Sequence, residues 1–169
     1  MPLRVESVYR DGITAGVIGA TAVAAWFLIV DTIGGRPFFT PTLLGDALMG
    51  VFARRGSLPI ESATALIGVY TVFHYIAFCI AGIILAVIVR VAQSTPSILG
   101  GLFILFIAFE VGSLGLVTLL ARATTLGSLA WYQVMAGNIV AAIAMAAYFW
   151  KGHPELHHTM EHALDGAED

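Results

Sequence analysis

Three polar side chains stand inside long apolar segments of this sequence: His74, Glu110 and Asn138. An imidazole, a carboxyl and a carboxamide exchange hydrogen bonds and can together hold a proton or an ion. Glu110 is the most informative of them, because a carboxylate in hydrocarbon costs several kcal/mol unless it is protonated or paired. Its own segment carries no nearby Lys or Arg, so His74 is the expected partner. Tyr70 and Ser113, each about one helical turn from His74 or Glu110, could complete the network.

The positions of these side chains within their segments predict that they lie at one depth in a membrane. Counted from the side opposite the termini, His74, Glu110 and Asn138 lie about 9–12 residues along their segments, or roughly 14–18 Å in a helix. One interpretation is a buried polar cluster that fixes the register of the helices, with a protonated Glu110. A proton- or ion-handling site is the main alternative. A cofactor or metal site, and a Glu110 that faces a partner protein, are the others.

The segments that must position these residues dominate the composition. Hydrophobic residues make up 59% of the chain and charged residues 11%, against about 25% charged residues in soluble domains. Mean hydropathy is +0.90. Four apolar segments reach the roughly 20 residues that a helix needs to cross a bilayer. The sequence therefore predicts an all-α polytopic membrane protein with one domain, residues 1–152. Its fold class is a four-helix transmembrane bundle, with spans over residues 12–33, 59–91, 96–122 and 128–150.

The loop after the first span contains a further helical pattern. Asp31 is interpreted as a residue of the helix end, close to Arg36. Thr40 and Pro41 then form a cap followed by a first-turn proline. Apolar residues follow at helical spacing: Leu43, Leu44, Ala47, Leu48, Val51 and Phe52. We expect an amphipathic helix over residues 41–55 that lies in the membrane interface or folds back against the bundle.

Small residues form stripes on the first and the fourth predicted span. Gly12, Gly16 and Ala20 repeat at intervals of four on the first span, and Gly137 and Ala141 do so on the fourth. Such stripes let membrane helices approach closely. They predict close helix packing without indicating which helix is the partner.

A short acidic tail, residues 153–169, is rich in histidine. His158 and His162 are four residues apart, so they share a helix face, and His157 precedes them. This spacing can chelate a divalent metal. The tail offers no groups to orient these ligands, so a solvated acidic end is the simpler interpretation. No cofactor is predicted.

Several classes of protein are excluded by charge and residue usage. The net charge is −3 and no Lys/Arg stripe exists, so a nucleic-acid partner is not expected. A single cysteine, Cys79, excludes an intrachain disulfide and a Cys-based zinc or iron–sulfur site. No nucleophile–base pair is visible, so we do not expect an enzyme. Basic residues are balanced between the two sides of the predicted bundle, and both termini are placed in the cytoplasm only because that orientation is commoner.

One set of short segments carries a resemblance: Trp26-Phe27-Leu28-Ile29-Val30-Asp31, Gly35-Arg36-Pro37, Thr40-Pro41-Thr42-Leu43-Leu44-Gly45, His74 with Phe78, Phe109-Glu110, Gly137-Asn138 and Tyr148-x-Trp150. Through them the chain resembles a group of small bacterial inner-membrane proteins with four spans and no assigned function. The resemblance covers most of the chain between Gly12 and Pro154. It implies a bacterial inner-membrane setting and lends no activity.

Two functions follow as expectations. The first is a non-catalytic accessory or scaffold subunit that acts in the lipid bilayer through helix packing, with other membrane subunits or by self-association. The alternative is a small proton- or ion-coupled transporter or channel component that uses His74, Glu110 and Asn138. A permeation path should be lined by a stripe of polar residues, and such residues are few here, which favours the subunit.

Overall fold

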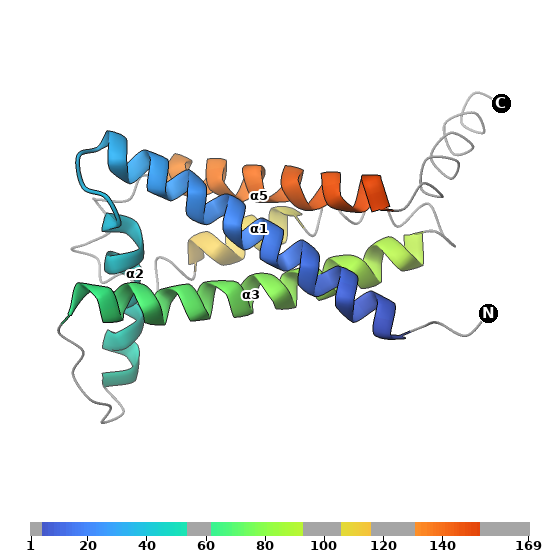
Figure 1. Cartoon of the computed structure of the whole chain (residues 1–169), viewed down its shortest axis with the longest axis horizontal. Coiled ribbons are helices and arrows are strands. Elements are labelled where there is room, and N and C mark those ends of the chain that lie inside the picture. Colours follow the sequence, from blue (N-terminus) through green and yellow to red (C-terminus); the bar gives the residue numbers. More distant parts are fainter. Residues whose placement is uncertain (1–4, 54–61, 93–105, 116–130, 153–169) are drawn as a thin grey trace.

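Every element of the computed structural model that can be described is a helix. The described residues are 5–53, 62–92, 106–115 and 131–152. They form α1 (Val5–Ile33), α2 (Phe39–Ala53), α3 (Ala63–Ala92), a short helix over Phe106–Gly115, and α5 (Trp131–Gly152) (Figure 1). Three stretches are long and apolar enough to cross a membrane: Ser7–Ile33, Ala63–Ala92 and Trp131–Gly152. The predicted all-α class is therefore confirmed for this part of the chain, and the three helices indicate a membrane protein.

The predicted third span is described only at its centre. The Phe106–Gly115 helix is apolar but too short to cross a bilayer by itself. The remainder of residues 96–122 lies outside the described residues, and so does the tail with His157, His158 and His162. The four-span bundle consequently stays a prediction.

The three long helices, α1, α3 and α5, extend along the length of the molecule (Figure 1). In Figure 1, α1 crosses obliquely over α3 and α5, which both run in the opposite direction to α1. With 30 residues, α3 is about 45 Å long, well beyond the roughly 30 Å hydrocarbon core of a bilayer. Such a helix must tilt or extend into the headgroup region.

The crossing of α1 and α3 is a contact between backbones. A Cβ atom on Gly16 would overlap the Phe78 carbonyl oxygen and the Cys79 backbone, and one on Gly82 would overlap the Gly12 carbonyl oxygen. Only glycine fits at these positions, because the two backbones lie where side chains would otherwise stand. Gly12 and Gly16 of α1 thus contact α3 of the same chain.

A second interface joins α1 to α5. Gly137 lies against the ring of Trp26, and the Trp26 indole N–H donates a hydrogen bond to the Gln133 carbonyl at 3.0 Å. Ala20 and Ala141 are buried. The buried apolar core lies along these two interfaces and consists of Ala15, Ala20, Val23, Phe27, Phe78, Ala86, Val89, Val134, Ala141, Met145 and Phe149.

The outer face of α3 is apolar and exposed. Its large side chains recur every three or four residues: Val72, Ile76, Ile80, Ile84, Val87 and Val91. We call these six residues the α3 outer stripe. Trp131 and Trp150 are exposed at opposite ends of α5, where membrane proteins carry aromatic belts. A continuous apolar surface of this kind suits contact with lipid or with another membrane helix.

The helix predicted in the first loop is present as α2. It packs against the beginning of α3 and crosses it steeply in Figure 1. A Cβ atom on Gly45 would overlap the Leu66 carbonyl, while Asp46 on the opposite face is exposed. Leu44 and Leu48 are buried, so the apolar face of α2 is turned onto the bundle.

Candidate functional site

The Phe106–Gly115 helix and α5 share a buried polar cluster. The Asn138 side-chain N–H₂ group donates to Glu110 Oε2 at 2.5 Å and to Ser113 Oγ at 2.9 Å. The Ser113 hydroxyl donates in turn to the Glu110 carbonyl at 3.0 Å. Both Glu110 and Asn138 are more than nine-tenths buried. Three of the polar residues singled out in the sequence are therefore brought together at one point.

The second carboxyl oxygen of Glu110 has a different environment. Oε1 is buried and has no hydrogen-bond partner among the described residues. A buried carboxyl oxygen without a hydrogen-bond partner is costly, so this atom needs an explanation.

His74 belongs to a separate group of residues. Its Nε2 atom lies 3.1 Å from the Ala20 carbonyl, which can only accept, so Nε2–H is the donor. Nδ1 is then the acceptor for the Tyr70 hydroxyl at 3.5 Å. Both ring nitrogens of the neutral imidazole thus have partners.

This arrangement corrects the expectation that His74 pairs with Glu110. The His74 ring packs on Phe78 with a centroid distance of 4.7 Å, and Phe78 contacts Phe109 at 6.1 Å. Aromatic rings, not hydrogen bonds, lead from His74 towards Glu110. Counting residues along a helix predicts the depth of a side chain. The partner of that side chain also depends on the side of the helix from which it projects, which the count does not give.

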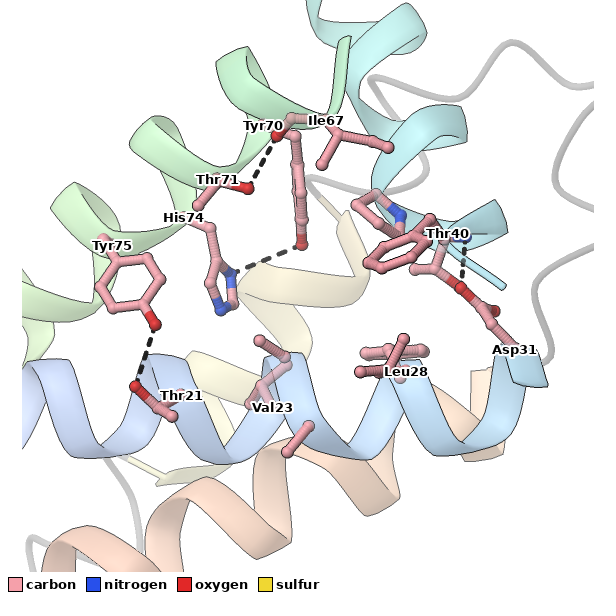
Figure 2. A pocket seen from close by; sticks show the side chains of 15 residues that line it. Thr21, Val23, Leu28, Asp31, Thr40, Ile67, Tyr70, Thr71, His74 and Tyr75 are labelled. Carbon is pink, nitrogen blue, oxygen red and sulfur yellow. Dashed lines mark hydrogen bonds between the residues drawn. The ribbon is translucent and has the colours of Figure 1, made fainter. Parts of the chain in front are cut away.

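A pocket of about 250 Å³ lies beside His74, between α1 and α3. In Figure 2, Val23 and Leu28 of α1 form one wall, Ile67 and Tyr70 of α3 form the opposite wall, and Thr40 of α2 closes one end. The Tyr70 hydroxyl points into this space (Figure 2). The pocket could not be predicted from the sequence, because its lining residues come from α1, the turn after it, α2 and α3, and they form a cavity only once these segments pack together.

One further buried contact was missed at the sequence level. The carboxylate of Asp31 accepts two hydrogen bonds from Thr40, from the backbone N–H and from the hydroxyl, both at 2.8 Å. Asp31 thereby caps the first turn of α2 from the end of α1, where a negative charge is favoured by the helix dipole. Arg36 contacts Asp31 through its backbone N–H, while its guanidinium lies 4.0 Å over the Phe39 ring. The Thr40-Pro41 pair indicated the start of a helix. The sequence alone does not reveal that the capping carboxylate comes from Asp31 at the end of α1.

We expect the exchange of Asp31 for alanine to detach the start of α2. The variant loses two hydrogen bonds to a charged acceptor and leaves the buried Thr40 donors unpaired, which costs about 2–4 kcal/mol. Thermal unfolding in one detergent measures the loss, and Asp46→Ala on the exposed face of α2 is the matched control. Equal melting temperatures for the two variants would contradict the capping role.

Among the described residues, no group of three or more His, Cys, Asp or Glu side chains is placed to hold a metal ion. The weak metal candidates of the tail lie outside those residues. No protein-family model, no curated protein and no solved structure matches this chain.

Proposed function

We propose that the chain is a non-catalytic subunit of the bacterial inner membrane, with four spans and both termini in the cytoplasm, that acts through helix packing with membrane partners. The Phe106–Gly115 helix supports the predicted third span, which would bring the number of spans to four, because it is apolar, lies within residues 96–122 and is hydrogen-bonded to α5. The bacterial inner-membrane setting follows the resemblance. Four spans put both termini on one side of the membrane, and the cytoplasmic side is chosen because that orientation is commoner.

The observation that carries this proposal is the use of the buried polar side chains. His74 joins α3 to the Ala20 carbonyl of α1, and Asn138 joins α5 to Glu110. Asp31 joins α1 to Thr40 of α2. Each of these contacts ties two helices together, which is the ordinary role of polar residues between membrane helices. A body held in this way presents a fixed apolar exterior for other subunits or for a second copy.

Site-specific crosslinking in native membranes tests the subunit function. A photoreactive residue is placed at Ile80 in the α3 outer stripe, and in a separate variant at Ile143, an exposed residue of α5. The proposal expects a protein adduct of one defined mass from at least one of these faces, and the same partner after mild solubilisation. Adducts to lipid alone from both faces, with a single chain after solubilisation, would refute the proposal.

The alternative is a proton or ion site at Glu110. A specific observation favours it: Oε1 is buried and unpartnered among the described residues, on a side chain that is 8% exposed. Buried polar atoms without partners are rare in folded proteins and need an explanation. A small ion or a transferable proton would supply one. Because Asn138 and Ser113 satisfy the rest of the cluster, we rank this function second.

A further inference from the structure

The position of the pocket along α3 sets its depth once α3 is placed in a bilayer. If α3 is centred on a bilayer core, about 7 Å of it extends beyond the hydrocarbon at each end. Tyr70 then lies about 3 Å inside the hydrocarbon boundary, because seven residues of a helix measure roughly 10 Å. Asp31 and Thr40 lie at the outer end of the pocket, and Thr21 and Tyr75 at its deep end. The pocket thus leads from the ester level of the lipids into the hydrocarbon.

The pocket is open to the outside of the bundle at these depths. Several of its lining residues are exposed, among them Ala24, Ala25 and Leu28 of α1 and Thr71 of α3. Buried apolar residues, Val23 and Phe27, form its floor. An open, apolar recess at this level faces the acyl chains of the surrounding leaflet.

Most polar groups in the pocket are already engaged. The carboxylate of Asp31 accepts both of its hydrogen bonds from Thr40. The Thr21 hydroxyl donates to the Val17 carbonyl and accepts from the Tyr75 hydroxyl at 2.9 Å. These described lining groups already have partners within the protein.

Tyr70 is the exception. Its hydroxyl lies 3.5 Å from His74 Nδ1, which is long for an O–H···N bond. The Tyr70 hydroxyl carries one proton and can turn about its C–O bond, so it can give up the long contact with His74 Nδ1 and donate at a shorter distance to an acceptor in the pocket. The pocket therefore offers one hydrogen-bond donor at the level of the lipid esters, and apolar walls below it.

We propose that this pocket binds one acyl chain of a membrane phospholipid, whose ester carbonyl accepts a hydrogen bond from the Tyr70 hydroxyl. The apolar walls take the chain, and the depth of Tyr70 matches the ester. This site is independent of the proposed subunit function, because it concerns lipid on the α1–α3 side and no partner protein.

Photolabelling in nanodiscs tests the site. The full chain is reconstituted in phosphatidylcholine that contains a small fraction of phosphatidylcholine with a diazirine on one acyl chain. Adducts are mapped by mass spectrometry. We expect labels on pocket-lining residues, among them Ala25, Leu28, Ile67 and Tyr70, in excess of labels on Ile80, Ile84, Val87 and Val91 of the α3 outer stripe.

Two pairs of variants sharpen the test. Ala25→Phe fills the pocket and should abolish the excess label, whereas Ala147→Phe on the exposed face of α5 should retain it. Tyr70→Phe should lower the label about 3–10-fold, the effect of one hydrogen bond. Tyr75→Phe should retain it, because the Tyr75 hydroxyl is engaged by Thr21. Melting temperatures confirm that each variant is folded before it is compared.

An ether-linked phosphatidylcholine isolates the carbonyl contact. This lipid lacks the ester carbonyl, so its labelling of the wild type should be weaker by the same factor as the Tyr70→Phe loss, and the two changes together should add nothing. Three results would overturn the proposal: label no stronger in the pocket than on the α3 outer stripe, label insensitive to Ala25→Phe, or displacement of the pocket label by a stoichiometric alkyl benzoquinone in the presence of the bulk phosphatidylcholine. The last result would identify a quinone as the occupant.

Discussion

Replacing Gly16 with alanine is expected to destabilise the protein, although alanine is the better helix former. A Cβ atom at this position would overlap the carbonyl oxygen of Phe78 and the backbone of Cys79. Backbone atoms do not move aside as a flexible side chain does, so α1 and α3 must separate along their crossing. Overpacking of this kind costs about 1–3 kcal/mol and occasionally more, which outweighs the gain of about 1 kcal/mol in helix propensity.

Gly68→Ala is the matched control for this variant. Gly68 also lies within a long helix, α3, but a Cβ atom there would meet nothing within 4 Å. The control should therefore be neutral or stabilising by up to about 1 kcal/mol. Thermal unfolding followed by circular dichroism in one detergent gives both values. If Gly16→Ala melts at or above the temperature of Gly68→Ala, the backbone contact between α1 and α3 does not exist.

Replacing Glu110 with leucine is the second change with a large expected effect. The variant removes the acceptor of the Asn138 amide inside the bundle, and a buried donor without its partner costs about 1–3 kcal/mol. Glutamine in the same place keeps a carbonyl oxygen for Asn138, so Glu110→Gln should be close to the wild type in stability.

The double variant Glu110→Leu/Asn138→Leu separates the pair from the general cost of a polar-to-apolar change. Removing both partners should cost less than the sum of the two single changes, because no donor is left unpaired. Additive losses would mean that Glu110 and Asn138 do not interact. The comparison uses the same thermal unfolding measurement as the glycine variants.

The long helices and the first-loop helix were within reach of sequence reasoning. Hydropathy alone indicated the apolar helices α1, α3 and α5. A chain segment inside a membrane must form its backbone hydrogen bonds within itself, so a long apolar segment is expected to be a helix. The Thr40-Pro41 cap and the apolar periodicity that follows it indicated α2. Hydropathy, caps and periodicity sufficed to predict these helices, because whether a segment forms a helix depends mainly on residues that are near one another in the sequence.

The partners of the polar side chains depended on more than local signals. Glu110 and Asn138 meet, as equal depth allowed, whereas His74 is turned towards the Ala20 carbonyl and Tyr70. A residue at a given depth can face any side of its helix. The side that it faces in the protein depends on how the helices pack, here through the close contact of α1 and α3 at Gly16 and Gly82. The same argument applies to the Asp31 cap and to the pocket, which require α1, α2 and α3 to be placed together first.

Proton flux into proteoliposomes is the measurement that bears most directly on whether the buried polar residues hold helices together or move protons. Wild type and Glu110→Gln are reconstituted at equal density, a potential is imposed, and acidification is followed with an entrapped pH dye. The structural role of Glu110 predicts that both proteins show only the flux of protein-free liposomes. A wild-type flux above this background that Glu110→Gln abolishes, with the fold intact, would contradict the account and make Glu110 a proton-transfer site.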